Sequence, residues 1–351
     1  MNDSSGNSLV ELPERIVKDV FIKLSEHERE LYDLLKDVSK RKFQSFVDSK
    51  SAGKNYLNVL EMVLRLRQCC DHPTLLVGHT KFNHSISADL VSLLMRFSSD
   101  GKTEARFTEG RDKEVQCSMC FDFADHYTLF NCEHVFCSSC ISGFDNGAAS
   151  VPLCPECGSL YRCSSSRTQA QQKPESFLHS SKTLALHRTL KELNSLDPHS
   201  KTVVFSQWTS MLDLIEQSFV ESGYRYLRMD GTCSQKEREK RLSEFCLSPD
   251  VKYLLLSLRT GGVGLNLVAA SNVILVDSWW NPAVDNQAID RVHRIGQTKT
   301  VEIRRLVVQD SIEERILELQ EKKSRLAQGA LSCFEGDQNR LQLEDIRLLL
   351  S

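Results

Sequence analysis

The sequence lacks the features of a membrane or secreted protein. No apolar run approaches the 18 or more residues that span a bilayer, and the N-terminus has no basic region followed by an apolar core. We therefore expect an intracellular protein with no membrane partner. Cellular thiols keep cysteines reduced in that compartment, so clusters among the 13 cysteines are judged as metal ligands and not as disulfides.

The sequence also lacks a loop that binds nucleotide phosphates. Such a loop reads Gly-x-x-x-x-Gly-Lys-Ser/Thr, because backbone amides surround the phosphates while the lysine and the hydroxyl serve charge and magnesium. Gly101-Lys102-Thr103 is similar, but Arg96 stands where the first glycine belongs and no predicted strand precedes it. No repeat at solenoid period is present either.

The composition is that of a folded protein with two or three domains. The chain has 351 residues, of which 40% are hydrophobic and 26% are charged, and its formal net charge is −3. Six basic residues between Lys36 and Lys54 face only Asp37 and Asp48, which leaves a locally positive stretch. This stretch could contact phosphate, or it could be an ordinary solvated helix face; the charge count alone does not decide between the two.

Helical periodicity dominates the first part of the chain. Ser25 and Glu28 form a capping box before a helix that runs towards Val47, and a second helix is predicted over 56–70, ending near His72-Pro73. Segments 98–114 and 161–181 are polar or Ser/Gln-rich and are predicted to be linkers.

After Ser181 the pattern changes to alternating helices and strands. A helix is predicted over 182–196, and the β-rich runs are 202–205, 226–229, 253–257, 272–276 and 301–308. This alternation predicts an α/β domain with a mostly parallel sheet covered by helices on both faces. Such sheets bind ligands at the carboxyl ends of their strands.

Between the two linkers lies a cluster of metal-ligand residues in four close pairs: Cys117 and Cys120, Cys132 and His134, Cys137 and Cys140, Cys154 and Cys157. Eight soft ligands satisfy two tetrahedral Zn²⁺ ions with no open position, which indicates structural sites. Cys69-Cys70-Asp71-His72 has no second pair nearby and is interpreted as a helix end with half-buried thiols. The single cysteines receive no role.

The stretch QAIDRVHRIGQ, residues 287–297, places two arginines three positions apart on what should be a helix, with a glutamine at each end. Arg291 and Arg294 would then point the same way and reach for one anion. Surface solvation is the ordinary alternative for such a pair. A glycine-rich turn at 258–267, which lets a ligand approach the backbone, precedes this stretch.

The order of the zinc ligands resembles a RING finger over residues 115–160. The resemblance implies a cross-brace, in which Cys117, Cys120, Cys137 and Cys140 hold one ion and the remaining ligands hold the other. It also implies that Met119 and Pro155 contact a ubiquitin-conjugating enzyme. Gly158 departs from the family pattern, because active ligases often carry a basic residue there; ligase activity and a purely structural zinc module are both open.

Residues 182–330 resemble the second RecA-like lobe of Swi/Snf-family DNA translocases. The motifs are Phe205-Ser-Gln-Trp208, Met229-Asp-Gly231, the glycine-rich turn, Asp277-Ser-Trp-Trp-Asn-Pro282 and QAIDRVHRIGQ. Leu12-Pro13, the helix from Leu24 and Leu66-Arg-Gln-Cys-Cys-Asp-His-Pro73 resemble the RING-containing, helicase-like transcription factor type. Residues 1–97 would then be a helical segment between lobes, and 331–351 a C-terminal tail helix.

The resemblance implies site residues and partners. Arg291 and Arg294 correspond to arginine fingers that stabilise the γ-phosphoryl group of ATP. The ATP-binding set implied is Gly262, Gly264, Gln287 and the two arginines. The DNA-binding set is Ser206, Gln207, Thr260, Gly261 and Trp280, with Trp279 assigned to packing. ATP and Mg²⁺ would be shared with a first RecA-like lobe that this sequence lacks.

These implications combine into one expectation: the C-terminal half of a nuclear, ATP-dependent translocase on double-stranded DNA or chromatin, with an embedded ubiquitin ligase, in DNA repair or damage tolerance. Alone, the fragment is not expected to hydrolyse ATP. The alternatives are a ubiquitin ligase or a zinc adaptor in which the RecA-like lobe is a scaffold without hydrolysis.

Overall fold

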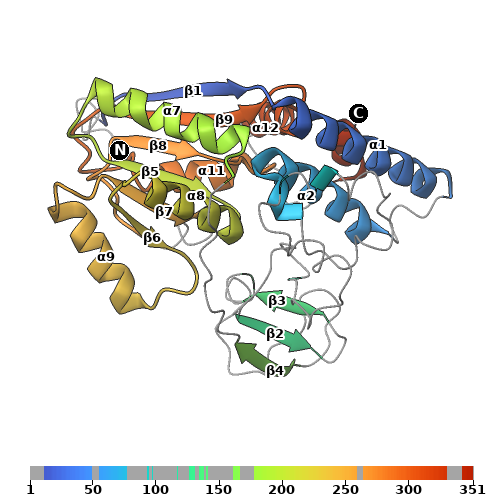
Figure 1. Cartoon of the computed structure of the whole chain (residues 1–351), viewed down its shortest axis with the longest axis horizontal. Helices are drawn as coiled ribbons and strands as arrows, with labels where there is room; N and C mark the ends of the chain where they lie inside the picture. The colour runs from blue at the N-terminus through green and yellow to red at the C-terminus, as the bar shows by residue number, and fades with distance from the viewer. Residues whose placement is uncertain are drawn as a thin grey trace. The chain divides into compact units, whose positions relative to one another are not determined.

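The computed structural model describes residues 12–49, 55–76, 93–94, 97, 117, 126–130, 134–137, 140, 161–166, 178–258, 264–329 and 342–350. The chain, drawn in Figure 1, divides into two compact units. The sheet unit comprises Met1–Leu24, Ser181–Gln207 and Ile215–Ser351, and the zinc unit comprises Ser25–Ser180 and Trp208–Leu214. Among the described helices, none has the length and apolar character to cross a membrane.

The sheet unit is built on six parallel strands in the order β1-β9-β8-β5-β7-β6. Their bounds are β1 Arg15–Ile22, β5 Thr202–Ser206, β6 Tyr226–Met229, β7 Tyr253–Ser257, β8 Asn272–Leu275 and β9 Val301–Val308. The mostly parallel α/β sheet is therefore confirmed, and the bounds of the five predicted strands agree within one residue. All residues of β5, β7 and β8 are buried, as expected for central strands covered on both faces.

Alternate residues of the central strands form the main core of this unit. Val203 pairs in register with Leu254 on one side and Val273 on the other, and Phe205 pairs with Leu256 and Leu275. These side chains share one face of the sheet, since strand side chains alternate with period two. Helix α11, Pro282–Ile289, and the residue Val292 pack their apolar side chains into the same cluster.

Strand β1 was not predicted, and the expectation that 1–97 forms one helical segment is wrong for its beginning. β1 pairs with β9 over eight residues, from Arg15 opposite Val301 to Ile22 opposite Val308. Charged side chains interrupt the apolar alternation of this strand. They are matched across the pair instead, because Asp19 binds Arg305 at 2.6 Å. The pairing partner lies nearly 290 residues away in sequence, so local pattern alone could not reveal the strand.

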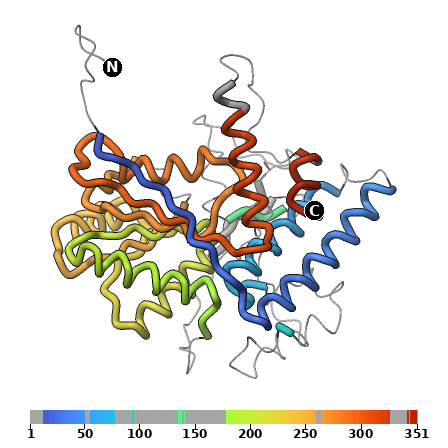
Figure 2. The backbone as a smooth tube through the Cα atoms, turned by 90° about the horizontal axis from the view of Figure 1, so that it is seen from above, coloured from blue at the N-terminus to red at the C-terminus, as the bar shows by residue number. Residues whose placement is uncertain are grey.

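Helices surround this sheet (Figure 1). They are α7 Ser181–Leu196, α8 Thr209–Glu221, α9 Gln235–Leu247, α11, α12 Ile312–Gly329 and α13 Leu343–Leu350. Of α8, only the part from Ile215 onward belongs to the sheet unit. Lys182 at the start of α7 forms a buried ion pair with Glu313 of α12. The predicted tail helix is α13, which lies beside α12 in Figure 2, buries Ile346 and Leu349, and places Asp345 3.5 Å from Lys323.

The zinc unit begins with two packed helices, α1 Glu26–Asp48 and α2 Tyr56–Asp71, followed by the short 3-10 helix η1 Pro73–Leu76. The predicted capping box is confirmed, because the Ser25 hydroxyl accepts from the Glu28 amide and the Glu28 carboxylate accepts from the Ser25 amide. The basic stretch on α1 leaves Lys40 and Arg41 exposed, while Leu31 and Leu35 are buried.

A small antiparallel sheet with strand order β3-β2-β4 completes the zinc unit. Its strands are β2 His126–Phe130, β3 Val135–Cys137 and β4 Tyr161–Ser166. The linker prediction for 161–181 is wrong for its first six residues, because β4 pairs with β2. A serine-rich composition suggested a linker, yet a short strand needs only a neighbouring strand with free backbone groups. The linker prediction for 98–114 lies outside the described residues.

Two hydrogen bonds join the chain on either side of the zinc-finger segment. The hydroxyl of Ser180 donates to the carbonyl of Asp71 at 2.8 Å, and Nε2 of His72 lies 2.8 Å from the carbonyl of Leu178. Nδ1 of His72 accepts from the amide of Thr74 at 3.2 Å, so the ring is neutral and Nε2 carries the proton. The residues just before and just after the zinc-finger segment, at 71–72 and 178–180, are therefore bonded to each other.

We expect this closure to weaken in acid. Burial lowers the pKa of His72 to about 4, from an ordinary value near 6.5. Because the unfolded chain binds the proton first, stability is lost as pH falls from about 6.5 towards 4, by roughly 3 kcal/mol at the lower end. Urea unfolding between pH 7 and 4.5 measures the loss. His72→Gln keeps a neutral amide donor and removes the titration, so a pH dependence as steep as that of the parent would contradict the assignment.

Candidate functional site

The arginine segment, residues 290–297, follows helix α11 at the edge of the sheet unit's main core. Asn281 caps α11 by accepting from the amide of Ala283, and the helix ends at Ile289. The expectation that Arg291 and Arg294 lie on a helix is therefore wrong, because both lie in turns beyond its end. The carbonyl of Arg291 accepts from the amide of Leu267 at 3.0 Å. In a continuing helix this carbonyl would instead accept from an amide four residues further along the chain.

Gln297 holds the far end of the arginine segment in place. Its side-chain amide donates to the carbonyls of Val268, Ala270 and Val292 at 2.8–3.2 Å. Its side-chain oxygen accepts from the amides of Thr298 and Lys299 at 2.9 and 3.0 Å. Gln297 is buried, so this glutamine fixes the backbone and does not reach for an anion.

The backbone on either side of these bonds adopts left-handed angles. Gly296 has φ of +101° and Gly264 has φ of +27°, a region that favours glycine. Gln287, at the other end of the stretch, is exposed on α11. Hydrogen bonds from Leu267 to Arg291 and from Gln297 to Val268 and Ala270 join the arginine segment to loop 264–270. The arginine segment and this loop thus form one rigid surface.

Both arginine side chains are half-exposed on this surface. Nη1 of Arg294 lies 3.5 Å from the carbonyl of Leu265, a long contact that leaves most of its donors available. Val292 between them is fully buried and anchors the turn. Guanidinium groups held in this way on a rigid backbone suit bidentate binding of a phosphate. Gly262, Thr260 and Gly261 of the glycine-rich turn lie outside the described residues.

Asp277 joins the ends of two central strands. It is buried after β8, where it accepts from the hydroxyl of Ser206 at 2.5 Å and from the amide of Gln207 at 3.0 Å. The Ser206 hydroxyl is thereby used inside the lobe, and Gln207 is 8% exposed. Ser206 and Gln207, the two predicted DNA contacts, lie at the carboxyl end of β5, where parallel sheets bind ligands. The Ser206 side chain fixes this strand end through its bond to Asp277.

The two tryptophans after β8 have the reverse of the exposure expected for them. Trp280, assigned to DNA, is 3% exposed, whereas Trp279, assigned to packing, is half-exposed. The rings stack with centroids 3.5 Å apart, and the buried ring of Trp280 is the one turned to the core. Gln320 of α12 donates to the Trp279 carbonyl at 2.6 Å and to Asp285 at 2.8 Å, and it fixes the backbone of the pair.

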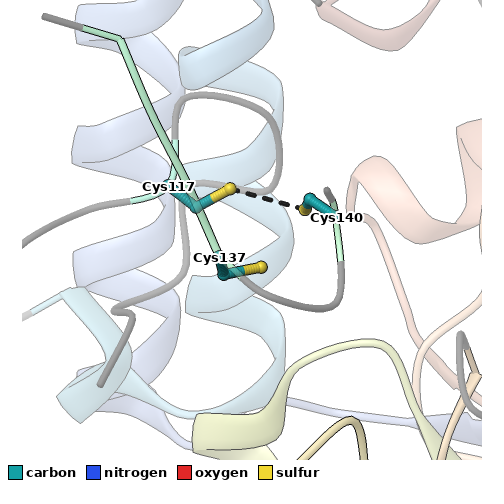
Figure 3. Close-up of side chains that lie close together, drawn as sticks. All are labelled: Cys117, Cys137 and Cys140. Atoms are coloured by element: carbon teal, nitrogen blue, oxygen red, sulfur yellow. Dashed lines mark hydrogen bonds between the residues drawn. The ribbon is translucent and has the colours of Figure 1, made fainter. Parts of the chain in front are cut away.

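Three of the four cysteines expected around the first zinc ion lie together. The sulfur atoms of Cys117, Cys137 and Cys140 are all within 4.8 Å of one another, and the sulfurs of Cys117 and Cys140 are 3.4 Å apart (Figure 3). Four sulfurs at about 2.3 Å from a tetrahedral zinc ion are about 3.8 Å apart, so the cluster fits the ion. Cys117 and Cys140 are buried, as expected for a structural site.

Short strands bring these cysteines together. Cys137 ends β3 and pairs in register with Tyr127 of β2, while Cys117 and Cys140 come from the flanking segments. His134, predicted for the second ion, is half-buried just before β3. Other predicted residues lie outside the described part of the chain: Cys120, Cys132, Cys154, Cys157, Met119, Pro155 and Gly158.

Comparisons with known families match both units. Residues 182–296 match the family model "Helicase conserved C-terminal domain", and residues 117–157 match "Zinc finger, C3HC4 type (RING finger)". Among solved structures, the C-terminal part of the Fun30 ATPase domain superposes with a TM-score of 0.58 at 23% identity, covering 97% of this chain and 98% of that one. The SWI2/SNF2 ATPase core of Sulfolobus solfataricus gives 0.55 at 23% identity, covering 96% and 50%.

Curated relatives match almost the whole chain. DNA repair protein RAD5A of Arabidopsis thaliana is 37% identical over 373 residues, which are 99% of this chain and 35% of the relative. The helicase-like transcription factor of Mus musculus is 36% identical over 361 residues, 98% of this chain and 36% of the relative. The chain thus spans about a third of the length of these relatives.

The parallel sheet, the arginine segment and the zinc cluster define a helicase C-terminal lobe combined with a RING-type zinc finger. The chain combines these two domains and is homologous over nearly its whole length to the RAD5A and helicase-like transcription factor relatives, and it shares the fold of the C-terminal part of the Fun30 ATPase domain. The zinc finger and its cysteine cluster make zinc a structural component of this chain.

Proposed function

We propose that this chain serves as the second RecA-like lobe of an ATP-driven translocase on double-stranded DNA, with an embedded RING ubiquitin ligase. It acts in the nucleus, in DNA repair or in tolerance of DNA damage. ATP and Mg²⁺ are held by a first RecA-like lobe, which this sequence does not contain. The relatives support this proposal by their names, DNA repair protein and helicase-like transcription factor.

The translocase part of the proposal rests on one observation, the fixed position of the arginine segment. Two half-exposed guanidinium groups lie three residues apart on a backbone held by Gln297 and Leu267, in a chain that has no phosphate loop of its own. Such groups stabilise the charge that develops on a transferring phosphoryl group without moving during the reaction. ATP held by the first lobe supplies that phosphoryl group when the two lobes close.

In this cycle Arg291 and Arg294 meet the γ-phosphate only when the lobes are closed. Hydrolysis removes the group that the arginines bind, so the closed state loses its advantage and the lobes reopen. DNA bound along the carboxyl ends of the strands, beside Gln207 and Trp279, is moved by this opening and closing. The half-exposed Trp279 offers a stacking face, and its backbone is held by Gln320.

The ligase half depends on Met119 and Pro155 contacting a ubiquitin-conjugating enzyme. Apolar side chains in zinc loops form such surfaces, and the zinc ions supply the rigidity that a short loop-rich module cannot gain from its own core. Zinc therefore has a structural role here: Cys117, Cys137 and Cys140, with Cys120, hold one ion, and Cys132, His134, Cys154 and Cys157 hold the other.

The proposal is tested by joining this chain to the first lobe of the Arabidopsis RAD5A relative; this protein is called the lobe fusion below. We expect double-stranded DNA to stimulate ATP hydrolysis by the lobe fusion and not by the chain alone. We also expect discharge of ubiquitin from a charged conjugating enzyme, lost in Met119→Glu. DNA-dependent hydrolysis by the chain alone would overturn the translocase half, and discharge unaffected by Met119→Glu would overturn the ligase half.

A further inference from the structure

The beginning of β1 contacts the end of α11 and the arginine segment at three points. Nε2 of His293 lies 2.8 Å from the carbonyl of Pro13. Nη2 of Arg15 donates to Oδ1 of Asn286 at 2.7 Å, and its Nη1 lies 3.6 Å from Oδ1 of Asp290. Segments about 275 residues apart in sequence therefore meet where the chain passes from α11 into the arginine segment.

The bond from His293 has a defined direction. A carbonyl oxygen only accepts, so Nε2 of His293 carries the proton and donates to Pro13. His293 stands two residues after Arg291 and immediately before Arg294. A displacement of the backbone at His293 therefore moves both guanidinium groups, and the position of the Pro13 carbonyl limits where they can lie.

These contacts contribute little to the stability of the lobe. Arg15 is 30% exposed and Asp290 is 61% exposed, and exposed ion pairs of this kind contribute at most about 1 kcal/mol. The apolar cluster that stabilises the sheet unit lies on its central strands and includes Ile289 and Val292. What the contacts to β1 determine is the position of the arginine segment relative to the point where the chain enters the sheet.

We propose that His293 and Arg15 are positioning residues for Arg291 and Arg294. They tie the arginine segment to Pro13, so that a shift of the chain just before β1 is passed to both guanidinium groups across one hydrogen bond and one charged pair. This proposal rests on the proposed function, because Arg291 must act on a phosphate for its position to matter. It adds residues that touch neither ATP nor DNA to the machinery of hydrolysis.

The test is made in the lobe fusion. We expect His293→Leu and Arg15→Ala each to lower the DNA-stimulated kcat about 10- to 100-fold, since a misplacement of about 1 Å costs about that much. The KM for ATP should stay within about twofold, because the first lobe holds the nucleotide. His293→Gln places an amide donor near the position of Nε2 and should restore kcat to within about threefold of the parent.

Lys18→Ala is the matched control, because Lys18 lies on the same strand and pairs with Glu302 of β9 at 3.3 Å, away from the arginine segment. It should leave kcat within about twofold. If His293→Leu does not fold, Arg15→Ala still tests the proposal. Arg15 lies on the edge strand of the sheet, so its replacement should not unfold the lobe. Equal losses in His293→Leu and His293→Gln, or parental kcat in both His293→Leu and Arg15→Ala, would overturn the positioning role.

A combined substitution separates this proposal from the proposed function. If His293 acts through the two arginines, adding His293→Leu to a variant that carries both Arg291→Ala and Arg294→Ala should change the residual kcat by less than about twofold. A full additional loss in that background would show that His293 acts elsewhere. Arg291→Ala that retains full activity would instead contradict the proposed function itself.

Discussion

Arg291→Ala in the lobe fusion should lower the DNA-stimulated kcat for ATP hydrolysis by at least about 10³-fold, and Arg294→Ala should do the same. An arginine that stabilises the charge of a transferring phosphoryl group accounts for roughly 10³ to 10⁵ in kcat. The backbone that carries both side chains is held by Gln297 and by the Leu267 amide, so alanine removes the guanidinium without releasing the turn. Steady-state hydrolysis with and without double-stranded DNA measures the effect.

Lysine at either position should restore little of the lost activity. A lysine keeps the positive charge but lacks the planar fork that binds two phosphate oxygens together. Arg315→Ala is the control for loss of one positive charge, because Arg315 is half-exposed on α12 and pairs with Glu318, three residues on, at 3.0 Å. Hydrolysis that survives both alanine substitutions, or that falls equally in Arg315→Ala, would rule out the arginine fingers.

Chelation of zinc should unfold the zinc-finger segment and leave the parallel sheet folded. Zinc binding at a structural site contributes roughly 10 to 16 kcal/mol, more than the net stability of most domains. We expect two zinc ions to be released per chain, together with loss of the circular dichroism of the small sheet β3-β2-β4. The unfolding transition of the sheet unit should remain, because its core is apolar and contains no zinc ligand.

Cys137→Ser provides the same test without a chelator. Cys137 ends β3 inside the cluster, so serine should remove one of the two ions and the folded signal of the small sheet. Cys246→Ser is the matched control, because Cys246 is exposed on α9 of the sheet unit, and it should retain both ions. A full zinc complement in Cys137→Ser, or an intact small sheet after chelation, would contradict the assignment of the cluster.

Much of this fold could be predicted from the sequence because it depends on local periodicity. Strands such as Tyr253–Ser257 are short apolar runs bounded by turns, and α1 begins at a capping box whose two bonds are made within four residues. The spacing of the cysteines likewise predicted a zinc cluster, and the structure brings Cys117, Cys137 and Cys140 together. Each of these features is decided by residues that are close in sequence or by a strict spacing.

The failures involve contacts between distant parts of the chain. Strand β1 exists because β9 offers a free edge, and the segment 161–166 is a strand because β2 lies beside it. The two tryptophans were assigned the reverse of their exposure, since one sequence position decides nothing about which ring of a stacked pair faces the core. No signal within either stretch could have shown these outcomes.

The sequence by itself determined the class of this protein through its helical and strand periods, a fixed order of cysteines, and a set of motifs in a fixed order along the α/β domain. It also supplied both arginines and the absence of a phosphate loop. Only the tertiary structure decided that these arginines lie in a turn, held by Gln297, Leu267 and His293. The physical reason is that hydrogen bonds between distant segments redirect a backbone whose local sequence would otherwise continue as a helix.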